Sequence, residues 1–236
     1  MAKKLSQNYL LAGLPPGEFR RLVPHLLPYT TKPGEELHQR TGSSLYVYFP
    51  INSVSSLVIT LTDGSMVEAA TVGNEGMVGL PLFVKSEAVS IQAFTHVGGN
   101  GLKMARSVLL VELKRERALC HRLHEYTEAL LLFIAQSCAC NQMHSQRQRC
   151  ARWLLLIHDR VGDHTFSLTQ EFLAQMLGVR RATVTVAAGA LRAQKLIAYR
   201  KGVIQILNRK GLEEAACECY KTVGQEFERL KNTPSI

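Results

Sequence analysis

Residues 167–196, SLTQEFLAQMLGVRRATVTVAAGALRAQKL, have the most informative pattern in the chain. Its pattern predicts two short helices joined by a tight turn. Thr169 is expected to cap the first helix, and Gly178 to adopt the left-handed backbone that ends it. The small Ala174 lets the second helix cross closely. The shared core is expected to contain Leu177, Val179, Val184 and Ala187. This pattern predicts a helix-turn-helix; the alternative is an ordinary pair of antiparallel helices.

The second helix and the segment after it carry the candidate contacts to a nucleic acid. Arg180 and Arg181 open the helix, and arginine with small residues in a first helical turn fits the major groove of DNA. Residues 196–207 predict a two-stranded hairpin with a basic tip, and residues 209–230 predict one final amphipathic helix. The predicted DNA-binding residues are Thr169, Gln170, Arg180, Arg181, Ala182, Thr183, Thr185, Val186, Arg200 and Lys201.

The positive charge of the chain is concentrated in its C-terminal part. The formal net charge is +9 over 236 residues. Residues 145–236 contain 15 Lys and Arg against 8 Asp and Glu, whereas residues 1–144 contain 13 against 11. A basic excess around a helix-turn-helix indicates a phosphate backbone as partner. Double-stranded DNA is therefore the predicted partner.

Neither a membrane segment nor an export signal is predicted. No run of 18 or more apolar residues is present, and the lysine-containing N-terminus lacks the apolar segment of a signal peptide. The six cysteines follow neither disulfide-scaffold nor CxxC spacing. We therefore expect a protein of the reducing cytoplasm that makes no membrane contact.

Residues 29–113 have the pattern of an antiparallel β domain. Short runs rich in Val, Ile, Thr, Tyr and Phe alternate with turn residues, and residues 62–65 predict a hairpin turn. The runs include SLYVYFPI, SVSSLVITLTDG, MVEAATVG, SIQAFTHV and SVLLVEL. Such spacing favours a sandwich or barrel over βαβ units. Residues 6–27, which precede this region, predict two short helices.

A long helix is expected to join the β domain to the DNA-binding region. From about Lys114 onward, apolar residues recur at alternating spacings of four and three, which is typical of a helical seam that pairs with another helix. A second copy of the same helix is the simplest partner, and the alternative is a helix packed only on its own β domain. The predicted dimer-interface residues are Leu119, Leu123, Tyr126, Leu130, Phe133, Ser137 and Cys140.

The predicted fold class is thus α+β, in three parts. Residues 1–113 form an antiparallel, jelly-roll-like β-roll, residues 114–143 a dimerisation helix, and residues 144–236 a winged helix-turn-helix DNA-binding domain. This order resembles the Crp/Fnr family of bacterial transcription regulators over nearly the whole chain. The resemblance rests on Gly34-Glu35, Gly42, Val47-Tyr48-Phe49, Asp63-Gly64, the segment from Gly73 to Gly79, Arg152-Trp153-Leu154-Leu155, and the block LTQEFLAQMLGVRRATVTVAAGALRAQKLI.

The resemblance implies a homodimer that binds palindromic promoter sites and contacts RNA polymerase. Thr169 matches the family's phosphate-contacting threonine, and Arg181 matches its leading base-reading arginine. Ala182 replaces the glutamate that often follows, and Val186 replaces the second base-reading arginine. The family's best-known half-site is therefore not implied. Arg181 can pair with guanine, while Thr185 and Val186 suit thymine methyl groups.

The segment that binds the effector in this family departs from the pattern of cyclic-nucleotide binders. Those proteins neutralise the cyclic phosphate with an Arg-Ser pair, but no arginine lies between Gly73 and Gly101 here, and Lys85 is the only cation in that window. A buried phosphate without a paired cation is costly, so cyclic AMP is not expected. The sequence does not identify the effector. A pocket for another ligand would involve Val72, Gly76, Met77, Val78, Ser90, Tyr126 and Leu130.

Spacing alone does not predict a metal site. Cys138, Cys140 and His144 could bind metal or respond to oxidants, but residues i and i+2 on a helix point apart, so small core residues are the preferred interpretation. The same interpretation applies to Cys217 and Cys219. Haem ligation by one of the eight histidines remains an alternative. The cofactor is therefore unknown.

Two other classes of function compete with a DNA-binding regulator. A cupin-like enzyme would need an HxH pair in its β domain, which here contains only His38 and His96, and GxSxG, HExxH and P-loop patterns are absent from the sequence. We therefore predict no enzyme. A ligand-binding protein without DNA function is the remaining alternative, and the basic excess with Arg180 and Arg181 argues against it.

Overall fold

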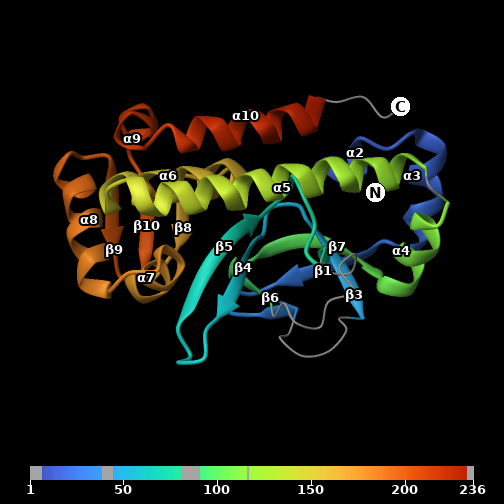
Figure 1. The fold of residues 1–236 in the computed structure, drawn as a ribbon, viewed down its shortest axis with the longest axis horizontal. Helices are drawn as coiled ribbons and strands as arrows, with labels where there is room; N and C mark the ends of the chain where they lie inside the picture. The colour runs from blue at the N-terminus through green and yellow to red at the C-terminus, as the bar shows by residue number, and fades with distance from the viewer. Residues whose placement is uncertain (1–6, 39–44, 81–90, 116, 233–236) are drawn as a thin grey trace.

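A long helix connects a β-roll to a helix-turn-helix region in the computed structural model, which describes residues 7–38, 45–80, 91–115 and 117–232 (Figure 1). The chain begins with two short helices, α2 (Tyr9–Ala12) and α3 (Pro16–Leu22), followed by the 3-10 helix η1 (Val23–His25). Asn8 caps α2, because its side-chain oxygen accepts a hydrogen bond from the backbone N–H of Leu11. The two predicted N-terminal helices are confirmed.

Two antiparallel sheets form the roll. The first has the strand order β1-β7-β3, and the second has the order β2-β6-β4-β5. The strands are β1 (Leu27–Thr31), β2 (Glu36–His38), β3 (Tyr46–Pro50), β4 (Val54–Thr60), β5 (Met66–Val72), β6 (Ile91–Val97) and β7 (Gly99–Ala105). Alternate residues of β3 point into the core, where Val47 and Phe49 are fully buried. The predicted antiparallel β-roll is confirmed.

The hairpin between β4 and β5 turns at residues 62–65, as predicted. Gly64 has a positive φ of 84°, and the backbone N–H of Ser65 donates to the Asp63 carboxylate at 2.9 Å. The segment SVLLVEL, expected as a strand, instead belongs to helix α4 (Arg106–Leu113). Leu109 is buried whereas Leu110 and Val111 are exposed, so burial does not follow the alternation that a strand requires.

The long helix α5 (Ala118–Met143) buries the predicted dimer seam inside its own chain. The seven seam residues are only 0–8% exposed in a single copy: Leu119, Leu123, Tyr126, Leu130, Phe133, Ser137 and Cys140. Most of them share one core with the roll and with the C-terminal helix α10 (Cys219–Asn232). The assignment of these residues to a dimer interface is therefore wrong. The pattern marks a buried face, but the chain itself covers that face.

The C-terminal part contains more elements than the sequence predicted. Helix α6 (Gln146–Val161) precedes α7 (Gln170–Leu177) and α8 (Arg181–Ala193). The expected hairpin is part of a three-stranded sheet of order β8-β10-β9, formed by β8 (Thr165–Ser167), β9 (Ile197–Arg200) and β10 (Val203–Ile206). The single final helix expected over residues 209–230 is divided into α9 (Arg209–Ala215) and α10.

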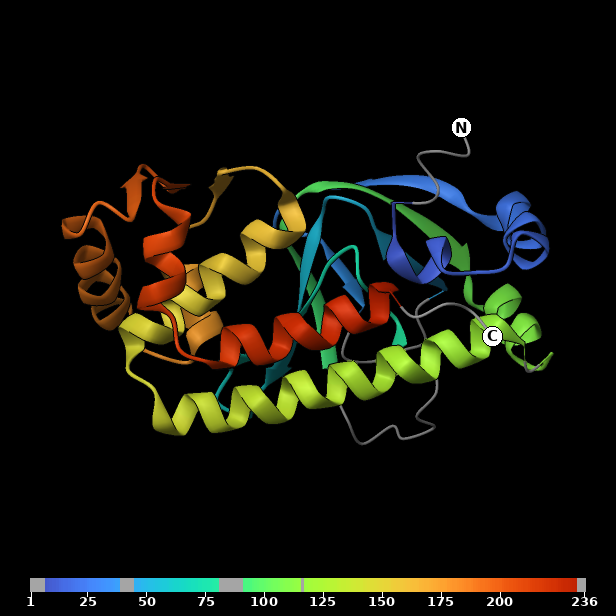
Figure 2. The ribbon, with the colours of Figure 1, turned by 90° about the horizontal axis from the view of Figure 1, so that it is seen from above.

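Helix α10 runs back along α5, as Figure 2 shows from above. Phe227 of α10 meets Phe133 of α5 edge to face, with ring centroids 5.8 Å apart. Arg122, which is 1% exposed, donates to the backbone oxygen of Leu230 at 2.8 Å and to that of Tyr9 at 3.2 Å. Arg122 of α5 thereby links α10 to α2 through hydrogen bonds. Within the described residues, none of the helices has the length and apolar character that a bilayer crossing needs.

Candidate nucleic-acid interface

The first helix of the helix-turn-helix begins and ends where the sequence predicts. The backbone N–H of Phe172 donates to the Thr169 hydroxyl at 3.1 Å, which caps α7. Gly178 ends the helix with a φ of 63°, a left-handed conformation that glycine adopts without steric cost. The expected core is confirmed, since Leu177, Val184 and Ala187 are buried and Val179 is half-buried.

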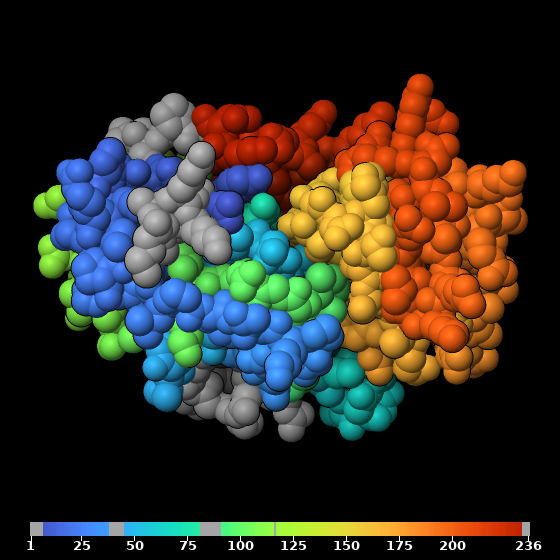
Figure 3. Space-filling model, turned by 180° about the vertical axis from the view of Figure 1, so that it is seen from behind, coloured from blue at the N-terminus to red at the C-terminus, as the bar shows by residue number. Residues whose placement is uncertain are grey.

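The second helix, α8, presents the predicted contact residues to solvent. Arg180, Arg181, Ala182, Thr185 and Val186 are exposed, and Val186 retains 73% of its accessible surface. Thr183 is half-buried. This helix and the β9–β10 hairpin are coloured orange and lie together at one end of the molecule (Figure 3). A single exposed valine is ordinary on a protein surface, and on this helix it also suits contact with the apolar groups of base edges.

A groove of about 450 Å³ separates α8 from the hairpin. Arg181, Arg192 and Lys201 contribute three cations to it, which makes it suited to a phosphate group. The lining residues are Thr169, Gln170, Arg181, Arg192, Tyr199, Lys201 and Gly202. Sequence reasoning missed Arg192 and Tyr199. The signal for Arg192 was its spacing, because it follows Arg181 by three helical turns.

The hairpin tip is held close to the start of α7. Lys201 and Gly202 both have positive φ, 49° and 75°, which is the backbone of a type I′ turn. The Gly202 carbonyl accepts a hydrogen bond of 2.7 Å from the backbone N–H of Leu168. The structure therefore brings Thr169, Gln170, Arg181 and Lys201 together, and it leaves Arg200 exposed at the same tip. Contact of these residues with DNA stays a prediction.

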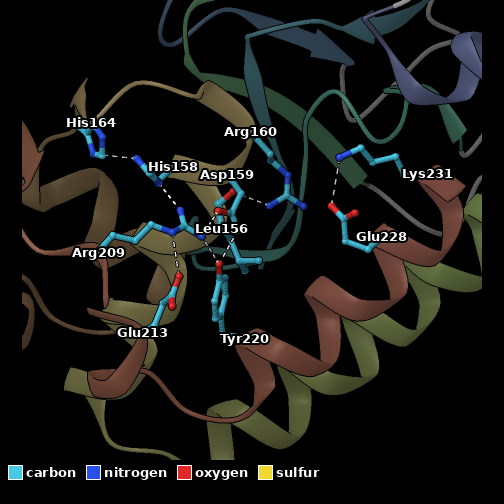
Figure 4. A network of polar contacts seen from close by, with 10 residues as sticks. All are labelled: Leu156, His158, Asp159, Arg160, His164, Arg209, Glu213, Tyr220, Glu228 and Lys231. Carbon is cyan, nitrogen blue, oxygen red and sulfur yellow. Dashed lines mark hydrogen bonds and ion pairs between the residues drawn. The ribbon is translucent and has the colours of Figure 1, made fainter. Parts of the chain in front are cut away.

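Helix α6 ties this region to the roll. The Trp153 indole N–H donates to the Glu68 carboxylate at 2.9 Å, and Trp153 also lies against the ring of His96. Further along the helix, Arg160 pairs with Glu75 at 2.9 Å, and both side chains are buried. Figure 4 shows Arg160 together with Leu156, whose carbonyl accepts a second hydrogen bond from it.

The residues predicted for an effector pocket belong to the packed core in this structure. Five side chains are 0–5% exposed: Val72, Met77, Val78, Tyr126 and Leu130. Gly76 is buried beneath the ring of Tyr126, because a Cβ atom added there would lie 2.2 Å from the ring. Ser90 and Lys85 lie outside the described residues. A ligand at this place stays a prediction and would have to move Tyr126.

Four potential metal ligands meet where α5 ends. Cys140, His144, Cys217 and Cys219 place their ligand atoms within 4.8 Å of one another. Cys138 does not join them and is exposed, as its i, i+2 relation to Cys140 requires. The interpretation of Cys140, Cys217 and Cys219 as small core residues is confirmed, since all three are buried in one cluster. Their meeting at one point was not predicted.

Together these elements define a winged helix-turn-helix protein with an N-terminal antiparallel roll. Residues 148–215 match the family model of the Crp-like helix-turn-helix domain. No curated protein sequence matches the chain. Among solved structures, FixK2 from Bradyrhizobium japonicum is similar, with a TM-score of 0.68 and 18% identity over 81% of this chain and 98% of that one.

Two further structures show the same likeness. A Crp/Fnr-family transcriptional regulator from Eubacterium rectale has a TM-score of 0.62 and 19% identity, covering 88% of this chain and 98% of that one. The c-di-GMP-responsive regulator CLP from Xanthomonas campestris has a TM-score of 0.63 and 14% identity, covering 80% and 98%. Residues 148–215 thus form a Crp-like helix-turn-helix domain, and the chain as a whole has the fold of these structures.

Proposed function

We propose that the protein is a transcription regulator that binds inverted-repeat promoter sites as a homodimer and reads them with α8. The exposed face of α8 beside the cationic groove is the observation that carries this proposal. Arg181 stands at the start of the helix, where recognition helices contact bases, and Thr169 and Lys201 flank the groove for the phosphate backbone. Val186 stands where the family has a second arginine, so the half-site differs from the family's best-known one.

The dimer contact is proposed on the face of α5 that the chain leaves uncovered. Leu131 is 66% exposed and Leu132 is 39% exposed, and Ala135 and Cys138 continue the same stripe at helical spacing. Figure 2 shows α5 along one edge of the molecule. To bind an inverted repeat, such a dimer has to hold its two recognition helices about one DNA turn apart, roughly 34 Å.

The roll is proposed as the sensor of a signal other than cyclic AMP, and RNA polymerase as a further partner. Arg160 is the cation seated at the turn that contains Glu75, but its charge is already paired with that carboxylate. A cyclic phosphate would have to break this buried pair, which is strongly unfavourable. A ligand that binds between the turn and Tyr126 would instead act on α5 directly, since Tyr126 is part of that helix.

Selection of bound sequences from random DNA by the purified protein tests the proposal. We expect enrichment of an inverted repeat, bound by a dimer, with affinity that falls steeply as salt rises. A monomer in sedimentation experiments that enriches no sequence would contradict it. The alternative, a ligand-binding or cupin-like protein without DNA function, predicts no salt-dependent DNA binding.

A further inference from the structure

The end of α5 and the start of α10 form a compact group of three sulfur atoms and one imidazole. Cys140 and His144 come from α5 and its C-terminal cap. Cys217 comes from the connection between α9 and α10, and Cys219 is the first residue of α10. The three cysteines are buried and His144 is half-buried. We propose that these four residues bind one zinc ion.

Two of the spacings between ligand atoms fit tetrahedral coordination, and all of them lie within 4.8 Å. Zinc bonds of about 2.3 Å to sulfur and about 2.0 Å to nitrogen place neighbouring ligand atoms roughly 3.5–3.8 Å apart. The Sγ atoms of Cys140 and Cys217 are 3.5 Å apart, and the Cys219 Sγ lies 3.6 Å from Nδ1 of His144. Three cysteines and one histidine are a common ligand set of closed, structural zinc sites.

The surroundings of His144 present the correct nitrogen to the site. Its Nε2 lies 3.2 Å from the carboxylate of Glu218, a geometry that favours the tautomer with the proton on Nε2, and its Nδ1 faces Cys219. A carboxylate that orients a histidine in this way is typical of the shell around protein zinc sites. Gln136 likewise donates from its amide to the Cys219 sulfur at 3.0 Å.

Buried positive charge next to the cluster balances the charge of a loaded site. Zn²⁺ with three thiolates carries a net charge of −1. Arg149 and Arg152 of α6 are each 5% exposed and lie close enough to interact electrostatically with Cys140, and both also act on Cys217. Within the described parts of the chain, the Nε atom of each arginine is buried and has no hydrogen-bond partner. An anionic metal–thiolate centre supplies the counter-charge that two buried guanidinium groups need.

The local fold explains why residues so far apart in sequence meet here. Ala216 adopts an extended backbone that separates α9 from α10, which turns Cys217 toward α5. Arg209 holds this connection in place through Asp159 at 2.7 Å, Glu213 at 2.9 Å and the Tyr220 hydroxyl at 2.7 Å (Figure 4). The side of the cluster that carries Cys217 and Cys219 is therefore positioned by contacts that do not involve the cysteines.

Zinc accounts for all four residues better than the alternatives. Thiolates are soft ligands and select zinc over magnesium or calcium, which prefer oxygen. A disulfide between Cys140 and Cys217 would use two of the four residues and would leave the orientation of His144 unexplained. A metal at this point fastens the joint between α5 and α6 to the last helix, so its loss should loosen the DNA-binding region from α5.

Metal analysis of the full-length, untagged protein, purified under reducing conditions without chelator, tests the proposal. We expect about one zinc per chain in the wild type and in Cys120→Ser, the matched control on the same helix but outside the cluster. Cys217→Ser and Cys219→Ser should retain less than one tenth of that zinc. Protein that binds no zinc after incubation with the metal, or ligand variants with undiminished zinc, would overturn the proposal.

A second measurement on the wild type does not depend on whether the variants fold. Replacement of the metal by Co²⁺ should give the intense visible bands of a tetrahedral site together with thiolate charge-transfer absorption. Removal of the metal by a chelator should make three further thiols per chain reactive toward a thiol reagent, those of Cys140, Cys217 and Cys219. Octahedral cobalt spectra, or a Cys140–Cys217 disulfide in protein alkylated inside cells, would contradict a zinc site.

Discussion

The indole Nε1 of Trp153 donates a hydrogen bond of 2.9 Å to Oε1 of Glu68, which joins α6 of the DNA-binding region to β5 of the roll. The other carboxylate oxygen of Glu68 accepts from the Ser56 hydroxyl at 2.5 Å. Burial raises the pKa of Glu68 to about 7, although both hydrogen bonds and the charges of Arg152 and Arg160 act in the opposite direction. The contact between the two parts therefore contains a carboxyl group that titrates near neutral pH.

Glu68→Gln should remove a pH-dependent part of the stability. Because the carboxyl pKa is higher in the folded state, its contribution to the free energy of unfolding is fully present below about pH 4.5 and is lost as the pH rises through about 7. The glutamine is neutral and can still accept from Trp153. Between pH 5 and pH 8, the unfolding free energy of the variant should rise by about 1–2 kcal/mol relative to that of the wild type. This is less than the full pKa shift implies, because Glu68 is only half-buried.

Urea unfolding of both proteins at pH 5 and pH 8 measures this difference. Burial and the charge of Arg160 lower the pKa of His96 to about 3. This group is present in both proteins, so its contribution to the unfolding free energy cancels in the comparison. Glu214→Gln on the exposed side of α9 controls for the loss of one negative charge. An equal gain at both pH values would show that Glu68 does not titrate in this range.

Arg181→Ala and Lys201→Ala should weaken DNA binding in different ways. In the proposed complex Arg181 reads a base, so its loss should cost about 1–3 kcal/mol per half-site and relax the preference at one base pair. Lys201 is proposed to contact a phosphate, so its loss should weaken binding to all sequences alike and reduce the salt dependence by about one charge. Binding to selected and random DNA over a salt series separates the two. Equal losses on both DNAs for Arg181→Ala would refute its base-reading role.

Leu131→Glu should separate the dimer without unfolding the chain. The side chain is 66% exposed, so a charge there costs little in one copy but would be buried between two. We expect the dimer dissociation constant to rise by at least about tenfold, or about 1.4 kcal/mol, in sedimentation equilibrium. Leu61→Glu, which is 51% exposed beside the β4–β5 turn, is the matched control and should leave the dimer intact. An undisturbed dimer in Leu131→Glu would place the interface elsewhere.

The sequence could predict what depends on local spacing. The cap at Thr169, the turn at Gly178 and the exposed face of α8 all follow from residues within one segment. The seam on α5 was recognised as buried but assigned to the wrong partner. Periodicity shows that a helix face is covered, but it does not identify the element that covers it. The cover comes from the roll and from α10, whose approach depends on contacts such as Arg122 with Leu230.

The cysteine cluster was missed for a related reason. The break that turns Cys217 toward α5 lies at Ala216, where neither glycine nor proline marks the end of a helix. The contacts that impose it, around Arg209 and Asp159, join residues about 50 positions apart. Similarly, SVLLVEL has strand-like composition, but packing of Leu109 against the core selects a helix.

Gly76→Ala should destabilise the joint between the roll and α5 through a clash with one side chain. The added Cβ would lie 2.2 Å from the Tyr126 ring, and Tyr126 is fully buried and has little room to withdraw. We expect a loss of about 1–3 kcal/mol of unfolding free energy. Gly189→Ala is the matched control, because it lies in the middle of α8 with open space around its Cβ and should be stabilising by about 0.5–1 kcal/mol.

Tyr126→Leu removes the ring, so the double variant Gly76→Ala/Tyr126→Leu should be more stable than the sum of the two single losses predicts. Strict additivity in this double-mutant cycle would mean that Tyr126 does not press on the turn that contains Gly76.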